Sequence, residues 1–490
     1  MKMEWKNWSR TITGAATGAA VSVLALSAAA CAEEAITFEA GSGESVDAFQ
    51  GSFMVPENRL DPDSRMIEIG YVRFPATTQT PGAPIVYLAG GPGGSGTGTA
   101  RGRRFDLFMQ MRQHGDVIAF DQRGTGLSGN DLPRCESSYG TDDLAFQSDM
   151  EVAAQYRAAI EECGAFWRAQ GVDIAGYTTR ESVQDISDLR AHLGADQVSL
   201  WGISYGSHLA LAALNDMPDE IDRVVLASVE GLDQTVKLPA RTDAYFARLQ
   251  EAVNTQEAAR TRYPDIAALM REVHARLEAQ PLRVEVPQRD GSMAEFLVQR
   301  HHLQQFSSMM ISDPENTAIL MALYATLYAG DTQLLVGLMS RFERANTPIT
   351  LRPMPTAMDI ASGISAERQA LYEAQAPNGL VGGYLNFPMP QASGVWDGFD
   401  LGDEFRIDPQ GATPVLVLTG TLDGRTYVEG QTEAIAGLEN AHQVIVENAG
   451  HNLFMVSSEV HDVIHAFMRG EDELADRITI DLPDFTELPF

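Results

Sequence analysis

Residues 201–207 are WGISYGS, and they carry the strongest structural signal of the chain. Gly202, Ser204 and Gly206 form the pattern G-x-S-x-G between an apolar run that predicts a strand and a segment that predicts a helix. The glycines permit a sharp turn, which holds the Ser204 hydroxyl exposed at its tip, in front of the helix N-terminus. We therefore predict that Ser204 is a nucleophile; a chance glycine–serine turn is the alternative.

Six short apolar runs around this turn predict a buried parallel sheet. Helix-like stretches, such as 183–193 and 207–215, separate most of them and favour helices on both faces. Residues 53–55 and 67–74 indicate two antiparallel strands ahead of the runs. The predicted class is α/β, with a mostly parallel eight-stranded sheet. The six runs are PIVYLAG (84–90), DVIAFDQ (116–122), QVSLWGIS (197–204), RVVLASVEG (223–231), PVLVLTG (414–420) and HQVIVENAG (442–450).

Residues 232–412 interrupt this series of strands. They carry helical patterns, for example over 245–257 and 266–278, and no clear succession of strands. We expect them to form a mainly helical cap inserted between two strands of the sheet. The catalytic core then consists of residues 31–231 and 413–490.

The first thirty residues, 1–30, predict an export signal. Three basic residues precede the uncharged stretch 11–30, which ends in small residues. Cys31 follows three alanines, as in a lipoprotein cleavage box, where the cysteine would be acylated. Ala28 stands where leucine is usual, so ordinary cleavage after residue 32 competes, and the small residues disfavour a retained membrane anchor. We expect an exported protein that is periplasmic, lipid-anchored or secreted, with membrane contact only through such an anchor.

The charge of the chain excludes one class of partner. The 67 acidic and 35 basic residues give a formal net charge of −32, which repels phosphate backbones. Nucleic-acid binding is therefore not expected.

The cysteines indicate one disulfide. Export implies an oxidising compartment, and once Cys31 is set aside only Cys135 and Cys163 remain. We predict that these two are linked; two buried free thiols are the alternative.

A serine nucleophile needs a base and a residue that orients the base. Asp423 lies just beyond the run 414–420, and His451 just beyond the run 442–450. Polar groups at the carboxyl ends of parallel strands meet at one edge of the sheet. We therefore predict a Ser204–His451–Asp423 triad, in which His451 is the general base. Glu447, Asp403 and Asp408 are weaker rivals, because they lie within or before their strands.

The glycine-rich segment AGGPGGSG, residues 89–96, follows the first parallel run and predicts an oxyanion loop. We expect the backbone N–H groups of Gly91 and Tyr205 to stabilise an oxyanion, and one such donor is typically worth ~3 kcal/mol. The same glycines also fit G-x-G-x-x-G with Asp121 after the next strand, as in dinucleotide sites. Pro92 and the density of glycine favour the loop, so no cofactor is expected.

The sequence HDVIH, residues 461–465, places two histidines on one helical face, as in some zinc sites. No third ligand is evident, and Val460, Ile464 and Phe467 fit a helix packed on the sheet. We expect no metal.

Five motifs follow one another along the chain: GGPGGSG (90–96), DQRGTGLSG (121–129), GISYGS (202–207), LTGTLDG (418–424) and NAGHN (448–452). In this order they resemble the proline iminopeptidase and tripeptidyl aminopeptidase group of α/β-hydrolases. The resemblance runs from about Gly51 to about His451 and includes VPENR (55–59). It implies an α/β-hydrolase fold with a helical cap, and peptidases that release residues from a free N-terminus, with proline favoured in some members. It also implies a structural turn at Asp121 and Arg123.

Two positions depart from the family pattern. Ala89 stands where relatives often have histidine, and GRTY follows Asp423 where exported relatives often have a turn with proline. These departures bear on substrate preference and leave the predicted triad unchanged.

A peptidase of this kind needs a carboxylate for the ammonium group of its substrate. Glu230 follows the VVLAS strand at the entrance to the cap and is our candidate; a salt-bridged or solvated loop residue is the alternative. The sequence thus predicts an exported serine aminopeptidase that acts on peptides with a free N-terminus through an acyl-enzyme at Ser204. A carboxylesterase of the same fold and a non-catalytic anchored binding protein are the alternatives.

Overall fold

The computed structural model describes residues 33–129, 132–140, 144–342 and 347–487. The predicted export signal and Cys31 lie outside these residues. Along the described chain, no helix is both long enough and apolar enough to cross a membrane.

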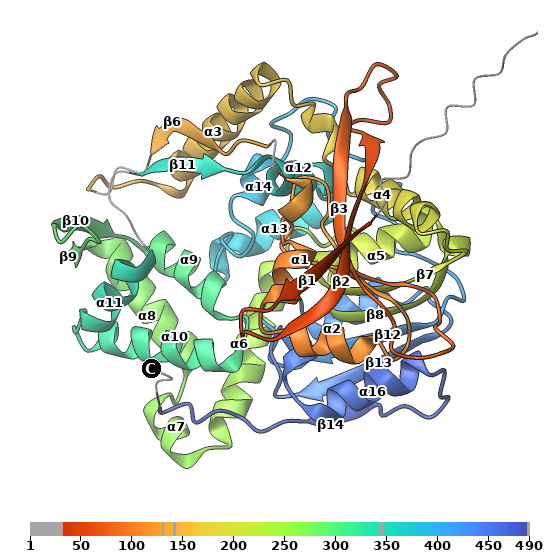
Figure 1. Ribbon diagram of the computed structural model, residues 1–490. Coiled ribbons are helices and arrows are strands. Elements are labelled where there is room, and N and C mark those ends of the chain that lie inside the picture. The colour runs from red at the N-terminus through yellow and green to blue at the C-terminus, as the bar shows by residue number, and fades with distance from the viewer. Residues whose placement is uncertain (1–32, 130–131, 141–143, 343–346, 488–490) are drawn as a thin grey trace, which may run out of the picture.

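A single large sheet runs through the described core (Figure 1). Its first three pairings are antiparallel and the other six are parallel. All eight predicted strands are present. In spatial order the strands are β1 (Glu34–Glu39), β2 (Ser45–Pro56), β3 (Met66–Phe74), β5 (Val117–Phe120), β4 (Ile85–Leu88), β7 (Val198–Ser204), β8 (Ile221–Val229), β12 (Val415–Gly420), β13 (Ala441–Glu447) and β14 (Arg477–Thr479).

Among the residues that the structure describes, the sheet has ten strands, so the expected number of eight was wrong. The two additional strands, β1 and β14, form its edges. β1 is acidic and mostly exposed, and β14 has three residues of which only Ile478 is buried. Edge strands of this kind lack the apolar run that identifies a buried strand in sequence.

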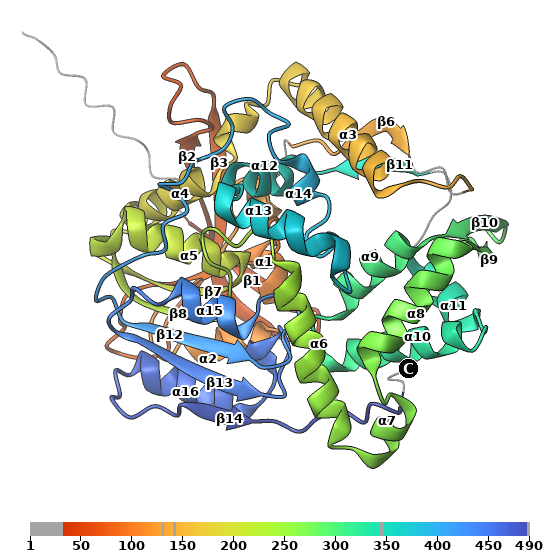
Figure 2. The same ribbon diagram turned by 180° about the vertical axis from the view of Figure 1, so that it is seen from behind.

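Alternation along the strands explains why helices cover both faces. In β4, Val86 and Leu88 pack with the helices α4 (Thr179–His192) and α5 (Tyr205–Asp216). Ile85 and Tyr87 point the other way, toward α2 (Phe105–Met111) and α16 (Ser458–Met468). Figure 2 shows the two layers on opposite sides of the sheet.

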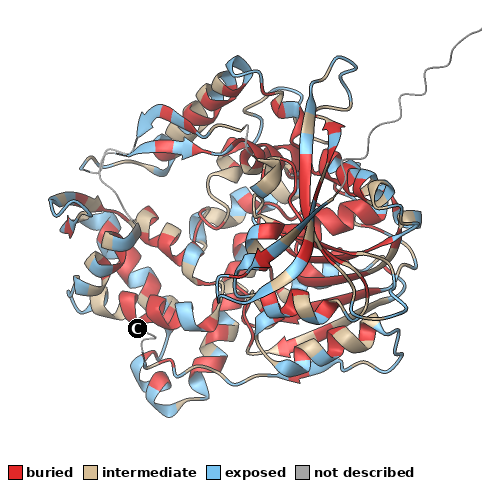
Figure 3. Ribbon diagram, viewed as in Figure 1, coloured by how far each residue is buried: buried red, intermediate tan, exposed pale blue. Residues whose placement is uncertain are grey.

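The segment between β8 and β12 contains nine described α-helices and three short strands, and it lies beyond the carboxyl ends of the parallel strands. Its first six helices pack around a hydrophobic core of their own, whereas its last helices, between residues 353 and 392, pack mostly against the core of the sheet; both regions are visible as buried ribbon in Figure 3. The elements are α6 (Pro239–Asn254), α7 (Glu257–Arg262), α8 (Ile266–Ala279), β9 (Leu282–Pro287), β10 (Met293–Val298), α9 (Arg300–Met310), α10 (Pro314–Tyr328), α11 (Gln333–Phe342), β11 (Pro348–Leu351), α12 (Pro353–Ser362), α13 (Ala366–Gln375) and α14 (Met389–Ala392).

An earlier part of the chain joins this region. β6 (Cys135–Gly140) pairs with β11, and α3 (Asp149–Ala169) packs beside both strands. Cys135 and Cys163 are joined by a disulfide, with their Cα atoms 5.6 Å apart. The disulfide therefore ties β6 to α3.

Candidate active site

Ser204 occupies a strained turn between β7 and α5. Its φ and ψ angles are 56° and −129°, in a region that side chains rarely adopt. A Cβ atom at Gly202 would lie 2.6 Å from the Gly206 carbonyl oxygen, and one at Gly206 would lie 2.0 Å from the Leu88 oxygen. Only glycine fits at either position, so the motif dictates the turn.

Asp423 and His451 are in direct contact at the neighbouring strand ends. The Nδ1 atom of His451 lies 2.9 Å from Oδ2 and 3.1 Å from Oδ1 of Asp423. The carboxylate also accepts hydrogen bonds from the Arg425 amide at 2.7 Å, the Thr426 amide at 2.9 Å and the Thr426 hydroxyl at 2.7 Å. An ionised carboxylate only accepts, so Nδ1 carries the hydrogen and Nε2 is left to accept a proton.

Asp423 is fully buried, yet its pKa lies below the usual range. Burial alone would raise the pKa, but the interaction with His451 and the hydrogen bonds from Thr426 outweigh that effect. Asp423 therefore remains ionised and fixes the orientation of the imidazole.

Strand β8 holds His451 next to the Ser204 turn. Ser204 is in register with Val229 of β8, and the hydroxyl of the adjacent Ser228 donates to the His451 carbonyl at 2.8 Å. Within the described chain the Ser204 side chain makes no hydrogen bond. Its hydroxyl is free to approach Nε2, a contact that often tightens only when substrate binds.

Residues 311–312, which follow α9, hold the two loops that carry Asp423 and His451. The His451 amide donates to the Ser312 carbonyl at 2.7 Å, and the Gly424 amide donates to the Ile311 carbonyl at 3.0 Å. A Cβ atom at Gly424 would lie 2.2 Å from that Ile311 oxygen. Sequence reasoning missed this support, because nothing in residues 311–313 resembles a catalytic motif.

The glycine-rich segment lies directly behind Ser204. A Cβ atom at Gly90 would lie 3.1 Å from the Cβ atom of Ser204. Asp121 anchors the loop, since its carboxylate accepts from the Ser95 hydroxyl at 2.7 Å and the Thr97 amide at 3.0 Å. These partners occupy the carboxylate that a dinucleotide site would need for ribose, which supports the oxyanion-loop interpretation.

Arg123 is buried among structural partners. Its Nε and Nη2 atoms donate to the two carboxylate oxygens of Asp185, both at 2.7 Å. Its Nη1 atom donates to the Glu57 carbonyl at 2.7 Å. Arg59 also donates to Asp185, at 2.7 Å. Glu57 and Arg59 belong to the VPENR motif, so this network gives that motif a structural role.

Glu230 lies at the end of β8 and is buried with a cation. Its Oε2 atom is 2.6 Å from Nζ of Lys237, which also donates to the Gln234 carbonyl at 2.6 Å. Burial lowers the pKa of Lys237 in spite of the attraction to Glu230. The candidate carboxylate thus has a partner, as the salt-bridge alternative anticipated.

A second carboxylate, Asp359 of α12, belongs to the same charged cluster. Removal from solvent raises its pKa well above the usual range, and repulsion from Glu230 adds to the effect, while Lys237 and Arg425 oppose it. No described residue forms a hydrogen bond or ion pair with its carboxylate. Asp359 was not predicted from sequence, because an aspartate on a helix far along the chain carries no local signal.

The two histidines of HDVIH have protein partners. His465 Nδ1 lies 2.8 Å from Nε2 of His114, and His461 lies 2.9 Å from the Phe454 carbonyl oxygen. No group of three or more metal-ligating side chains is found among the residues with described positions. Val460, Ile464 and Phe467 are buried against the sheet, as expected.

The parallel sheet, the turn at Ser204 and the helical insertion together define an α/β hydrolase. The chain belongs to the alpha/beta hydrolase fold family, whose model matches residues 83–458.

Peptidases are among the similar proteins. The chain is 27% identical to the serine protease Hip1 of Mycobacterium tuberculosis over 217 residues, which are 43% of this chain and 40% of that protein. It is 28% identical to a tripeptidyl aminopeptidase of Streptomyces lividans over 36% of this chain and 35% of that protein. It is 31% identical to a proline iminopeptidase of Arabidopsis thaliana over 30% of this chain and 27% of that protein. The matched region thus spans less than half the length of each relative.

Proposed function

We propose that this protein is an exported serine aminopeptidase that releases N-terminal residues or short peptides. One observation carries the proposal: the Asp423–His451 pair and the charged cluster of Glu230 and Asp359 lie at the same edge of the sheet as Ser204. The first supplies acyl-transfer chemistry, and the second supplies negative charge for a substrate ammonium group. The names of the similar peptidases support the same reaction class.

The proposed reaction has two steps. His451 Nε2 takes the Ser204 proton while Oγ attacks the carbonyl carbon; the C–N bond then breaks, and His451 gives the proton to the leaving amine. Water, activated by the same imidazole, releases the acyl group from Ser204. The amides of Gly91 and Tyr205 stabilise the oxyanion, and neither is a donor in a loop or cap hydrogen bond of the described residues.

The ammonium group binds between Glu230 and Asp359 in this proposal. Lys237 already offsets the charge of Glu230, whereas the carboxylate of Asp359 keeps its acceptor sites. A bound cation would lower the raised pKa of Asp359 and leave it ionised. Binding of the amine should therefore strengthen as pH rises through the pKa of Asp359.

A panel of substrates tests the activity. Aminoacyl, dipeptidyl and tripeptidyl anilides, with and without proline next to the anilide, are compared with their N-acetylated forms and with simple esters. We expect acetylation to reduce kcat/KM strongly. Equal cleavage of free and acetylated substrates would contradict the aminopeptidase proposal, and preferential cleavage of esters would establish the carboxylesterase alternative.

Export and lipidation belong to the same proposal and have their own test. Mass spectrometry of the mature protein should find an N-terminus at Cys31 carrying acyl chains, or an unmodified N-terminus just after residue 32. An intact N-terminus at Met1 in the purified native protein would contradict export by this signal.

The disulfide has a separate test. Mass spectrometry of unreduced digests should show Cys135 linked to Cys163.

A further inference from the structure

Gln122 is a buried glutamine beside the glycine-rich segment, and the reaction proposed above gives it no role. It follows Asp121 just after β5, and it is fully shielded from solvent. Its Nε2 atom donates to the Ala89 carbonyl at 3.0 Å. Because a carbonyl oxygen only accepts hydrogen bonds, this contact fixes which way round the amide lies. The side chain therefore holds the residue at which the glycine-rich segment begins.

The other polar atom of this amide has no partner in the described chain. Gln122 Oε1 is buried, and no described residue donates a hydrogen bond to it. Buried acceptors normally have partners, and an unpaired one lowers stability. An apolar side chain of the same size would only exchange this unpaired acceptor for the Ala89 oxygen, so the glutamine adds little net stability. What it adds is a donor at the glycine-rich segment.

The glycine-rich segment cannot fix its own shape. Residues 90, 91, 93 and 94 are glycines, and the φ angles of Gly91 and Gly93 are 126° and 95°. Glycine has no side chain to pack, and it adopts more backbone conformations than any other residue. The directions of the amides in this segment therefore depend largely on contacts made from outside it.

Two consecutive residues hold the two ends of the segment. Gln122 binds Ala89 at its start. Asp121 accepts a hydrogen bond from the Ser95 hydroxyl at 2.7 Å, near its end. The anchor is itself fixed, because the Gln122 carbonyl accepts from the amide of Thr125 at 2.9 Å and from its hydroxyl at 2.8 Å. The amides between the two ends are therefore placed by this pair of residues.

The end that Gln122 holds lies against Ser204. A Cβ atom at Gly90 would be 3.1 Å from the Cβ atom of Ser204. The Ala89 carbonyl and the Gly91 amide belong to neighbouring peptide planes, which are joined at Gly90. A rotation of the first plane therefore changes the direction of the Gly91 N–H, which is the candidate oxyanion donor.

We propose that Gln122 is a positioning residue for the oxyanion donor: it holds the Ala89 carbonyl so that the Gly91 N–H points at the reacting carbonyl oxygen. The inference rests on the proposed function, because this role exists only if Ser204 performs acyl transfer. The charge on that oxygen develops in the transition state, so Gln122 acts on kcat and hardly on KM.

Gln122→Met tests the donor, because it removes the amide and nearly preserves the volume of the side chain. We expect kcat on the best free-amine anilide to fall about 10–100-fold, less than for complete loss of an oxyanion donor. KM should change by less than about twofold. Tm should stay within a few degrees of the native value, since one unpaired acceptor replaces another. An unchanged kcat, or a loss of activity explained by a large fall in Tm, would overturn the proposal.

Gln122→Glu gives a readout that a purely structural role would not give. A protonated carboxyl group can donate to the Ala89 carbonyl, whereas a carboxylate cannot. Burial raises the pKa of a carboxyl group. The ratio of kcat in the variant to kcat in the native protein should therefore be highest at low pH and fall as pH rises through that raised pKa. The ratio cancels the titration of His451, which both proteins share. A ratio independent of pH would contradict the role, even if the methionine variant does not fold.

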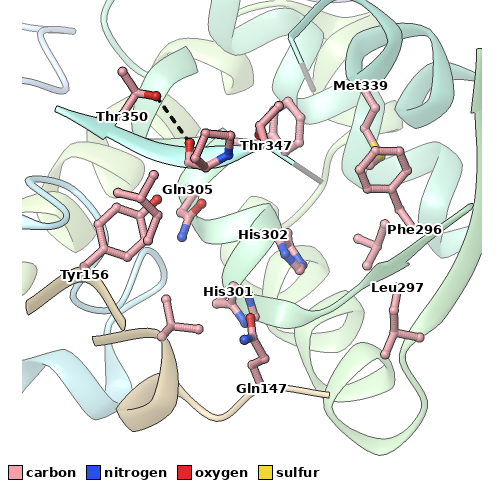
Figure 4. A pocket seen from close by; sticks show the side chains of 15 residues that line it. Gln147, Tyr156, Phe296, Leu297, His301, His302, Gln305, Met339, Thr347 and Thr350 are labelled. Atoms are coloured by element: carbon pink, nitrogen blue, oxygen red, sulfur yellow. Dashed lines mark hydrogen bonds between the residues drawn. The ribbon is translucent and has the colours of Figure 1, made fainter. Parts of the chain in front are cut away.

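A glutamine of the cap is the matched control. Gln305 lines a cavity of about 230 Å³ whose walls include α3, α9, β10 and β11 (Figure 4). Neither Ser204, Asp423 nor His451 lines this cavity. Gln305→Met should leave kcat and KM unchanged. An equal fall of kcat in this variant would show that the effect is not specific to Gln122, and it would overturn the assignment.

Failure of the proposed function can be told apart from failure of this inference. A fluorophosphonate reacts with an activated serine without any peptide being bound, and its phosphoryl oxygen uses the same oxyanion donors. If the native protein reacts with it but cleaves no free-amine anilide, the aminopeptidase function is wrong, and the rate constant of inactivation replaces kcat.

That rate constant should fall at least about tenfold in Gln122→Met and stay unchanged in Gln305→Met. Equal rate constants for the native protein and both variants would refute the role of Gln122 alone. If the native protein does not react with the fluorophosphonate either, Ser204 performs no acyl transfer, and both proposals are wrong.

Discussion

Asp423 and Asp359 both interact with Arg425, but their surroundings differ. Asp423, at the end of a core strand, accepts hydrogen bonds from His451, Thr426 and the Arg425 amide, and its pKa is lowered. Asp359, on a cap helix, has no such partner within the described chain, and its pKa is raised. The core carboxylate is already used to position a side chain, whereas the cap carboxylate retains its capacity to bind a ligand. In the proposed function, the core carboxylate therefore serves the chemistry and the cap carboxylate serves substrate selection.

The largest effect should come from the core turn. Ser204→Ala removes the nucleophile and should lower kcat by roughly a millionfold, measured with the best free-amine anilide. A fluorophosphonate probe should label the native protein at Ser204 and leave the variant unlabelled. Ser292→Ala, in the exposed turn between β9 and β10, is the matched control and should keep full activity. Substantial turnover by the Ser204 variant would refute the mechanism.

The next effect concerns the partner of His451. Asp423→Asn preserves the shape of the side chain but removes the charge that fixes the imidazole, and kcat should fall by about ten-thousandfold. Asp403→Asn, at an exposed carboxylate that was a rival in sequence, should not change kcat. If the Asp403 variant lost activity instead, the assignment of Asp423 would be wrong.

A smaller, selective effect should follow from the cap carboxylate. Asp359→Asn should raise KM for free-amine substrates by about 10–100-fold, as for loss of one charge-assisted hydrogen bond, and should leave acetylated substrates unaffected. In the native protein KM should fall as pH rises through the raised pKa of Asp359, until the substrate amine itself loses its proton near pH 8. The variant should lack this pH dependence.

Asp331→Asn, at an exposed carboxylate before α11, is the control for Asp359. An equal rise in KM for free and acetylated substrates would show that Asp359 acts on cap structure, and it would remove the contrast between the two carboxylates.

The smallest effect should be on the pH dependence of stability, and it comes from His114, a histidine away from the candidate site. Burial, with a contribution from His465, lowers the pKa of His114 from 6.5 to about 4. Between these values the unfolded chain binds more protons than the folded one, so stability falls as pH drops from about 6.5 to about 4. His114→Phe should reduce this fall in Tm by a few degrees. His442→Phe, at a partly exposed histidine, should not reduce the fall. Identical pH profiles for all three proteins would contradict the prediction.

The core could be predicted from sequence because its signals are local. Apolar runs identified six of the eight inner strands, and residues 53–55 and 67–74 identified the other two. The glycines at 202 and 206 identified the strained turn, since each close contact excludes a side chain. The contact of His451 with Asp423 followed from their positions after adjacent strands. The catalytic roles of these residues stay predictions.

The contacts that the cap makes around the candidate site could not be predicted in the same way, because they join distant parts of the chain. Asp359 is 129 positions from Glu230, and the peptide carbonyls of Ile311 and Ser312 support loops more than 100 residues further on. Backbone contacts of this kind depend on how the cap docks, and any residue type can supply a carbonyl group. The edge strands β1 and β14 were missed for a related reason, since exposed edges need no apolar run.

The hydrogen bonds from Gly424 and His451 to the segment after α9 have a consequence for the order in which the protein matures. The sheet alone can place Ser204, but the loops of its two partners close around backbone that belongs to the insertion. A chain whose insertion has not yet docked would therefore lack a positioned base. Under the proposed mechanism, such a chain gains hydrolytic activity only when the insertion docks, and it stays inactive until then.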